Sequence, residues 1–252
     1  SVRKVEILTK NTVLILGARS DIAMASAHRF AKAGYDIQLA ARNANDLSVD
    51  SNDIELRHQV SVSLHEFDAL EIQSHETFVD NLPQLPTVAV CAVGFMGAQH
   101  ESEQDISAAA RVMRSNFEGP ASILAVLANK FEQRGSGCIV GISSVAGDRG
   151  RATNYVYGSA KAGFTAFLSG LRNRLAKKGV HVMTVLPGFV ATKMTEGMDL
   201  PAKLTAEPDE LADAIYQAMT QGKNTIYRRR LWYFIMMIIR NIPESIFKKL
   251  KL

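Results

Sequence analysis

Short, apolar, β-rich segments alternate with longer segments of helical period along almost the whole chain, and this alternation restricts the possible folds most strongly. The strand-like segments are apolar along their whole length, which is typical of strands buried on both faces of a parallel sheet. We therefore expect an α/β protein with a doubly wound parallel sheet flanked by helices. The expected strands are TVLIL (12–16), DIQLAA (36–41), VSLHEF (62–67), TVAVCAV (87–93), GCIVGIS (137–143), VHVMTVL (180–186) and NTIY (224–227), and the main expected helices cover residues 20–33, 103–130, 155–177 and 208–221.

The composition fits one large domain followed by a distinct tail. The chain has 252 residues, of which 47% are hydrophobic, so it is long enough to bury a full core. We expect residues 1–227 to form one domain, and residues 228–252 to form a basic amphipathic tail that either joins this domain or associates with a membrane. The start of the chain, SVRKVEILTKNTVLILG, lacks the apolar run and cleavage site of a signal peptide, which favours a cytoplasmic protein.

The positive charge of the chain lies in its tail. The net charge is +4, but the residues from Arg228 onward contain seven basic residues and one acid, Glu244. The first 227 residues therefore hold 22 basic and 24 acidic residues, which is not the footprint of a nucleic-acid-binding protein. Cys91 and Cys138 both lie in strand-like segments, so we expect buried thiols, with no disulfide and no metal site.

A glycine-containing turn follows the first expected strand, at the position where a doubly wound fold of the Rossmann type binds a dinucleotide. The turn reads GARSDIAMA, residues 17–25, and its backbone amides and helix N-terminus suit a pyrophosphate. Asp21 and Ala23 stand where later glycines are usual, so an ordinary strand-to-helix turn is an equal alternative. In the dinucleotide interpretation the contacts come from Gly17, Arg19, Ser20, Asp21 and Ile22.

The end of the second expected strand indicates which dinucleotide would bind. An NAD-selective site usually has an aspartate or glutamate here, which accepts hydrogen bonds from the ribose hydroxyls. Ala41 and Arg42 stand here instead, and they leave room and positive charge for a 2′-phosphate. We therefore expect NADPH in preference to NADH; the competing interpretation is an exposed arginine without a ligand.

The segment GISSVAGDRGRATNYVYGSAKAGF, residues 141–164, carries the strongest chemical signal. Tyr157 and Lys161 are four residues apart, so they lie on one face of a helix, where the ammonium would lower the pKa of the phenol. Ser143 and Ser144 end the preceding strand at the same sheet edge, where a hydroxyl can hydrogen-bond a substrate carbonyl. Taken alone, a Tyr-x-x-x-Lys pair is more often a solvated helix pair.

These motifs resemble those of the short-chain dehydrogenase/reductase family, and the resemblance extends from the first strand to the last. It implies that Tyr157 and Lys161 are the catalytic pair and that Ser144, thirteen residues before the tyrosine, is the catalytic serine. It also implies that Asn116, in RSNFEG, helps to hold a proton-relay water. All four catalytic positions are therefore filled.

The resemblance also implies further cofactor contacts. PGFVAT, residues 187–192, is similar to the family's Pro-Gly loop, with Pro187, Gly188, Val190 and Thr192 at the cofactor and Thr192 bonded to the nicotinamide carboxamide. Asp68 and Ala69, in EFDAL, match the residues at the adenine. The fourth strand departs from the family, because it reads CAVG and keeps only Gly94 of the usual Asn-Asn-Ala-Gly.

The implied activity is reduction of a ketone by a nicotinamide cofactor. FDAL, NYVYGSAKAGF, PGFVATKMT and MMIIRNIPESIFKKL are similar to segments of family members that reduce a 2-ketosugar linked to a polyprenyl phosphate. One alternative substrate is a soluble or acyl-chain ketone of the 3-oxoacyl type, and the alternative from another class is a non-catalytic cofactor-binding scaffold. Residues 194–206 are expected to cover the substrate pocket. Family analogy implies a homo-oligomer.

The tail is too short to span a bilayer. Residues 231–239 are nine consecutive apolar residues, which as a helix reach about 14 Å, under half of a bilayer core of roughly 30 Å. We expect Pro243 to divide the tail into two short helices. Apolar and aromatic residues flanked by Arg and Lys suit the surface of an anionic inner membrane leaflet, and the alternative is burial at a subunit interface.

Overall fold

The computed structural model describes residues 10–252 and shows a seven-stranded parallel sheet of strand order β3-β2-β1-β4-β5-β6-β9. The strand order reverses between β1 and β4, which confirms the predicted doubly wound fold. The first nine residues of the segment tested for a signal peptide lie outside the described part. The strands are β1 (Thr12–Leu16), β2 (Asp36–Ala41), β3 (Val62–Glu66), β4 (Val88–Cys91), β5 (Gly137–Ile142), β6 (Val180–Pro187) and β9 (Thr225–Arg228).

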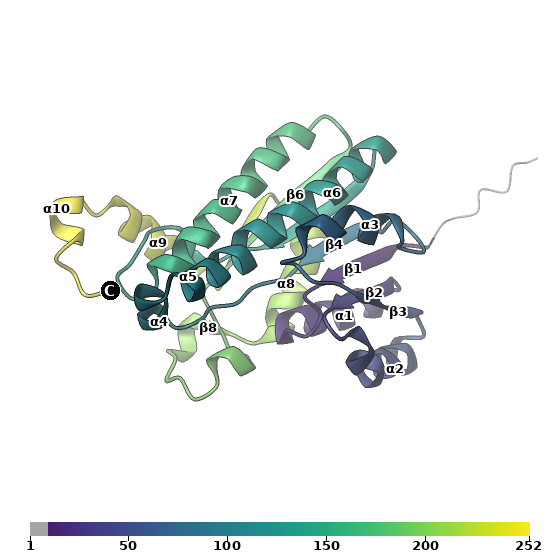
Figure 1. Ribbon diagram of the computed structural model, residues 1–252, viewed down its shortest axis with the longest axis horizontal. Helices are drawn as coiled ribbons and strands as arrows, with labels where there is room; N and C mark the ends of the chain where they lie inside the picture. The colour runs from purple at the N-terminus through teal and green to yellow at the C-terminus, as the bar shows by residue number, and fades with distance from the viewer. Residues whose placement is uncertain (1–9) are drawn as a thin grey trace, which may run out of the picture.

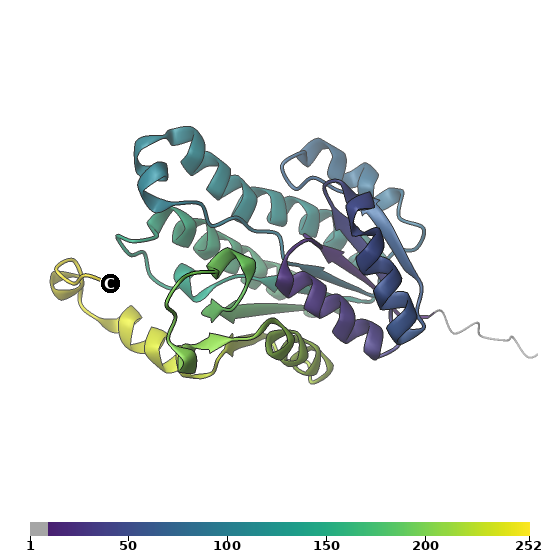
Figure 2. The same ribbon diagram turned by 90° about the horizontal axis from the view of Figure 1, so that it is seen from below.

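Helices cover both faces of the sheet (Figures 1 and 2). One face packs on α1 (Asp21–Lys32), α2 (Ser48–His58) and α8 (Pro208–Thr220), and the other on α3 (His75–Asp80), α6 (Gly119–Arg134) and α7 (Tyr155–Leu175). Alternate side chains of β1 serve the two faces, because Val13 and Ile15 join the first core while Leu14 and Leu16 join the second. All four are fully buried, which explains why this strand is apolar throughout.

Short elements complete the chain. A two-stranded ribbon of β7 (Phe189–Val190) and β8 (Thr205–Ala206) lies beyond β6. The short helical turns are η1 (Ala44–Leu47), η2 (Ile72–Ser74), η4 (Val145–Gly147), η5 (Lys193–Thr195) and η6 (Ala202–Leu204).

The single helix predicted for residues 103–130 is wrong, because this region is divided. It contains α4 (Gln99–Gln104), α5 (Ile106–Met113), the π-helical turn η3 (Arg114–Glu118) and then α6. Asp105 interrupts the first part, since its backbone is extended and its carboxylate accepts from the Ser107 amide at 2.9 Å, which starts a new helix. The π turn inserts a local change of helical pitch around Asn116.

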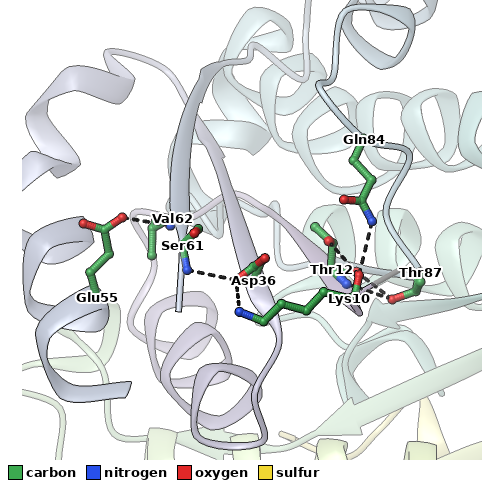
Figure 3. Close-up of polar contacts among 8 residues, drawn as sticks. All are labelled: Lys10, Thr12, Asp36, Glu55, Ser61, Val62, Gln84 and Thr87. Atoms are coloured by element: carbon green, nitrogen blue, oxygen red, sulfur yellow. Dashed lines mark hydrogen bonds and ion pairs between the residues drawn. The ribbon is translucent and has the colours of Figure 1, made fainter. Parts of the chain in front are cut away.

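Polar contacts join the amino ends of the strands, on the edge of the sheet away from the strand carboxyl ends (Figure 3). The Asp36 carboxylate accepts from Lys10 Nζ at 2.6 Å and from the Ser61 amide at 2.9 Å, which links β2 to the starts of β1 and β3. Thr87 Oγ1 donates to the Thr12 carbonyl at 2.9 Å and accepts from the Thr12 amide, which links β1 to β4. The Thr87 hydroxyl thus adds to the backbone bond between Thr87 and Thr12, and the Asp36 carboxylate satisfies the Ser61 amide.

The C-terminal residues form two helices, α9 (Leu231–Asn241) and α10 (Glu244–Phe247), separated at Pro243. Both lie on the same side of the molecule as α4 and α5 (Figure 1). Trp232 and Met236 of α9 are buried against Val145 and Leu186 of the main domain. The Arg149 guanidinium donates to the carbonyls of Ile239 and Ile242 and pairs with Glu244 at 2.7 Å, so it caps the end of α9.

Gly188 determines how closely α9 approaches the domain. A Cβ atom at Gly188 would lie 2.0 Å from Trp232 Nε1, a separation that no side chain tolerates. The indole also donates to the Leu204 carbonyl at 3.0 Å and packs edge-on against Phe189. The glycine therefore gives the space that the single tryptophan of the chain occupies.

We predict that Gly188→Ala displaces the Trp232 indole toward solvent. The free energy of unfolding should fall by about 1–3 kcal/mol, the usual cost of overpacking, and tryptophan emission should shift to the red. Chemical denaturation followed by fluorescence measures both quantities. Gly170→Ala is the matched control, since a Cβ at Gly170 meets no atom within 4 Å and should leave the emission unchanged. Unchanged emission in Gly188→Ala would show that the indole packing is wrongly described.

Candidate active site

The loops after β1, β4, β5 and β6 meet at the carboxyl edge of the sheet, at the point where the strand order reverses. Two cavities of about 380 and 210 Å³ lie there, and they share Arg19, Ser20, Gly94 and Phe95 among their lining residues. The larger one is lined by Arg19, Ser20, Asp21, Ile22, Gly94, Ser144, Tyr157, Lys161, Pro187, Gly188, Val190 and Thr192. The smaller one adds Gly17, Arg42, Asp68 and Ala69, so every predicted site residue except Asn116 lines this cleft.

The turn after β1 has the geometry of a phosphate-binding loop. Gly17 adopts a φ of +80°, and a Cβ there would lie 3.0 Å from the backbone of Ala92 and Val93, so the turn passes directly against the end of β4. The Ser20 hydroxyl accepts from the Ala23 amide at 3.1 Å and begins α1. The N-terminal amides of α1 therefore lie at the cleft, where their dipoles favour an anion.

Asp21 and Ala23, which stand where later glycines are usual, have other roles in this structure. Ala23 is fully buried in the core beneath the turn. The Asp21 carboxylate accepts from the Lys193 amide at 2.7 Å, so it joins the start of α1 to the loop after β7. This contact is a departure from the usual glycine-rich turn, and it fixes one end of the segment that covers the cleft.

Two arginines, Arg19 and Arg42, line the smaller cavity near the carboxyl end of β2. Arg42 is exposed and lines the smaller cavity. Arg19 lines both cavities and pairs with Asp46 at 2.8 Å. Glu66, at the end of β3, accepts from the amides of Asn43 and Ala44, and these bonds lower its pKa. Its role is to hold the turn after β2.

The segment with Asp68 and Ala69 is fixed from behind. The imidazole of His75 is fully buried and bridges the Asp68 carbonyl, at 3.0 Å, to the Ser122 hydroxyl, at 2.8 Å. The Asp68 carboxylate accepts from the Leu70 amide at 2.9 Å. Ala69 packs so closely on Gly119 that a Cβ there would lie 2.5 Å from the Ala69 carbonyl oxygen. This wall of the smaller cavity is therefore rigidly positioned.

Ser144, Tyr157 and Lys161 converge on the larger cavity because η4 packs closely on α7. A Cβ at Gly158 would lie 2.7 Å from the Ala146 carbonyl oxygen, and one at Gly147 would lie 2.6 Å from the Ala162 amide. The two glycines thus allow the turn that follows Ser144 to contact the first turns of α7. Lys161 is 4% exposed, and its ammonium donates to the Ile142 carbonyl at 3.2 Å.

The protonation states of Tyr157 and Lys161 differ from those expected from the sequence. We expected Lys161 to lower the pKa of Tyr157, but burial raises this pKa to about 12, and interaction with the Ser144 hydroxyl only partly opposes the shift. The Lys161 nitrogen lies 5.7 Å from the centre of the tyrosine ring. Burial lowers the pKa of Lys161 itself to about 8. At neutral pH the phenol therefore keeps its proton and the amine is mostly charged.

Asn116 is fully buried and lies behind the cleft wall. Its amide group accepts from the Phe95 amide at 3.2 Å and donates to the carbonyls of Phe95 and Val112, at 2.6 and 2.8 Å. A Cβ at Gly94 would lie 3.0 Å from Asn116 Oδ1 and 3.5 Å from Lys161 Nζ. In this structure Asn116 positions the loop after β4, and Gly94 separates it from the cleft.

The loop after β6 forms the remaining wall. Thr192 begins η5, and its backbone amide donates to Thr195 Oγ1 at 3.0 Å. The chain leaves at β7 and returns at β8, so residues 191–204 form a flap, of which Met194 and Met198 face the larger cavity. This agrees with the predicted cover over residues 194–206.

Several cleft residues were not predicted from the sequence. The larger cavity is also lined by the apolar side chains of Phe95, Met96, Met194, Met198 and Trp232, and by Arg151 and Asn154. Trp232 belongs to the apolar run of residues 231–239, and no local pattern distinguishes it from its apolar neighbours. Arg151 and Asn154 stand within the motif region that contains Ser144 and Tyr157, and this proximity was the available signal.

The cleft fits a nicotinamide dinucleotide. It offers helix-terminal amides after Gly17, arginines at the β2 end and a turn at Gly17 that passes directly against the end of β4. Within residues 10–252, no group of three or more His, Cys, Asp or Glu side chains is arranged to hold a metal ion. The thiols of Cys91 and Cys138 are unpaired, and burial raises their pKa values to about 11 and about 12, respectively.

Comparison with known proteins agrees with this geometry. Residues 11–201 match the model of the short chain dehydrogenase family. An uncharacterized oxidoreductase of Mycobacterium tuberculosis is 36% identical over 241 residues, which cover 94% of this chain and 96% of that protein. An uncharacterized oxidoreductase of Streptomyces coelicolor is 31% identical over 242 residues, with 95% of each chain covered.

Solved structures show the same architecture. A short-chain dehydrogenase from Sphingobium yanoikuyae, solved in complex with NADPH, superposes with a TM-score of 0.79 at 25% identity, over 93% of this chain and 97% of that one. A bulky-bulky ketone specific alcohol dehydrogenase from Comamonas testosteroni gives a TM-score of 0.76 at 24% identity, over 93% and 96% of the two chains. The fold, the cleft and the sequence relationships lead to one conclusion: the chain belongs to the short-chain dehydrogenase family of oxidoreductases.

Proposed function

We propose that this protein is an NADPH-dependent ketoreductase that acts on a ketosugar carried by a polyprenyl phosphate. The observation that carries the proposal is the convergence of Ser144, Tyr157 and Lys161 on a cavity that adjoins a dinucleotide-shaped groove. The larger cavity is lined by both apolar side chains and polar groups, which suits an amphiphilic substrate.

In this proposal the side chains divide the reaction between them. A nicotinamide held in the cleft would supply the hydride, and Tyr157 would donate its proton to the keto oxygen. Burial raises the pKa of Tyr157 to about 12, so the phenol carries this proton at neutral pH. The Ser144 hydroxyl orients the keto oxygen, and the Lys161 ammonium stabilises the phenolate left after donation.

NADPH is the proposed cofactor. Arg42 and Arg19 both line the smaller cavity, and Ala41 stands where an NAD-selective site usually has a carboxylate. The Sphingobium yanoikuyae relative was solved in complex with NADPH, which supports the same choice.

The substrate assignment rests on motif similarity. FDAL, NYVYGSAKAGF, PGFVATKMT and MMIIRNIPESIFKKL resemble the ketoreductase subunit of decaprenylphosphoryl-ribose 2′-epimerase, which reduces a 2-keto sugar on a polyprenyl phosphate. The competing enzyme substrate is a soluble or acyl-chain ketone, and the competing class is a cofactor-binding scaffold without turnover. NADPH oxidation with a ketone that depends on Tyr157 excludes the scaffold.

We further propose that α9 and α10 contact an anionic membrane surface, at the cytoplasmic face. The inner side of α9 packs on the domain, while its outer side exposes Leu231, Tyr233, Phe234, Met237 and Ile238. The exposed cations Arg230, Arg240, Lys248, Lys249 and Lys251 surround this apolar surface. A second copy of the chain would bring two such positive clusters together, whereas anionic headgroups complement them. No helix within residues 10–252 is long and apolar enough to cross a bilayer.

Tyr157→Phe tests the proton donor. The variant should lose turnover by roughly 10²- to 10⁴-fold, the range of general acid catalysis, while NADPH binding stays near the wild-type value. Steady-state NADPH oxidation and a fluorescence titration with NADPH give the two readouts. A variant that keeps most of its rate would show that another group donates the proton.

Arg42→Ala tests the cofactor preference. Loss of the contact with the 2′-phosphate should weaken NADPH binding by about 1–3 kcal/mol and leave NADH binding nearly unchanged. Arg57→Ala, on the outer side of α2, is the control, because Arg57 pairs with Asp53 and lines neither cavity. Equal losses for the two cofactors would reject the role given to Arg42.

A double substitution on the outer side of α9, Phe234→Ser with Ile238→Ser, tests the membrane contact. Binding to vesicles of phosphatidylglycerol should fall roughly tenfold or more, since each large apolar side chain contributes about 1.5–3 kcal/mol when buried. Cosedimentation measures it, and Leu56→Ser, which is 81% exposed on α2, is the control. Point variants are needed because deletion of residues 228–252 would also remove Trp232 from the cleft. Unchanged sedimentation, with a smaller oligomer, would support a subunit interface instead.

A further inference from the structure

Arg151 and Asn154 line the larger cavity, and part of each side chain is buried without a protein partner. Arg151 Nε and Asn154 Oδ1 are inaccessible to solvent, and neither makes a hydrogen bond with any residue from 10 to 252. The Arg151 guanidinium as a whole makes no ion pair in the same range. Arg149, two residues earlier, is fully engaged with Glu244 and the end of α9. The two residues thus differ in function, although both belong to the loop before α7.

Orphaned groups of this kind are costly. A buried polar group without a partner costs about 1–3 kcal/mol, and more when it is charged, so native proteins keep such groups mainly where something else completes them. Burial also lowers the pKa of Arg151. The desolvation of the guanidinium therefore costs free energy that no carboxylate among the described residues offsets. An anion in the larger cavity would give the Arg151 guanidinium the counter-charge that residues 10–252 do not supply.

Their position separates them from the dinucleotide. The phosphate-binding features of the cleft are the N-terminus of α1 and the arginines at the β2 end, and Arg151 lines only the larger cavity. It shares that cavity with Ser144 and Tyr157, and Asn154 precedes Tyr157 by three residues at the start of α7. Phe95, Met96, Met198 and Trp232 give the same cavity an apolar wall. A molecule held by Arg151 in this cavity would therefore be the substrate.

We propose that Arg151 forms an anion subsite in the larger cavity, which selects a ketone that carries a phosphate group. The planar guanidinium donates to phosphate oxygens. This subsite rests on the proposed function, because it defines the substrate whose keto group reaches Tyr157. A sugar phosphate and a lipid-linked phosphate share this chemistry.

Ligand binding tests the subsite without turnover. Farnesyl phosphate, kept below its micelle concentration, and farnesol differ only in the phosphate, and both can be titrated by calorimetry and by the emission of Trp232. Saturating NADP⁺ fills the phosphate sites of the dinucleotide groove first. Farnesyl phosphate should bind at least tenfold more tightly than farnesol, and Arg151→Met should remove roughly tenfold or more of its affinity while leaving farnesol binding unchanged.

Three variants separate recognition from a structural role. Arg151→Lys should recover part of the affinity, because it keeps the charge but loses the planar fork. Asn154→Asp should weaken farnesyl phosphate binding, since a carboxylate repels the phosphate. Arg57→Met removes one positive charge from α2, away from the cleft, and should change nothing. Equal losses for phosphate and alcohol in Arg151→Met, or unchanged binding of farnesyl phosphate, would overturn the proposal.

Two further comparisons identify the source of the phosphate and test the subsite separately from the proposed ketoreductase activity. Ribose 5-phosphate, compared with ribose, represents a free sugar phosphate, and Arg151-dependent binding of farnesyl phosphate alone would indicate a lipid-linked substrate. If Arg151-dependent phosphate binding occurs but no ketone supports NADPH oxidation, the ketoreductase proposal fails and the subsite stands. If neutral ketones are reduced while neither phosphate binds through Arg151, the ketoreductase stands and the subsite fails.

Discussion

The burial of a parallel sheet on both faces is the constraint on which the rest of this structure depends. A strand such as β1 has no polar face, because its alternate side chains enter two different cores. Polar and charged groups that perform chemistry must therefore stand near the ends of the strands, either in the loops or on the first turns of a helix, as Tyr157 and Lys161 do on α7. The amino ends are occupied by structural contacts such as those of Asp36, and the carboxyl ends at the reversal of strand order carry the cleft.

Close backbone packing converts this edge into a specific site. Glycines at 17, 147 and 158 allow chain segments to approach within distances that a Cβ atom would prevent. The first brings the phosphate turn against the end of β4, and the other two bring the turn after Ser144 against α7. Lys161 is carried into the interior by the same packing, where its ammonium has the Ile142 carbonyl as a partner. Burial then raises the pKa of Tyr157 and lowers the pKa of Lys161.

The C-terminal helix α9 belongs to the cleft as well as to the surface. Trp232 closes one side of the larger cavity, while Phe234 and Ile238 point outward from the same helix. Arg149 holds the end of α9, and Arg151, two residues later, faces the cavity. If the membrane and subsite proposals both hold, an amphiphilic substrate would meet an apolar outer surface, a tryptophan wall and a cationic subsite along one path.

The order of strands and helices and the doubly wound fold could be predicted from the sequence, because apolar periodicity is a local property of the chain. Ser144, Tyr157 and Lys161 were predicted as cleft residues from their spacing together with the resemblance to short-chain dehydrogenases, because the spacing alone is ambiguous. Only the tertiary structure placed Asn116 behind Gly94, raised the pKa of Tyr157, brought Trp232 into the cleft and left Arg151 Nε without a partner among the described residues. Each of these depends on burial and hydrogen-bond partners contributed by segments distant in sequence, which residue spacing does not encode.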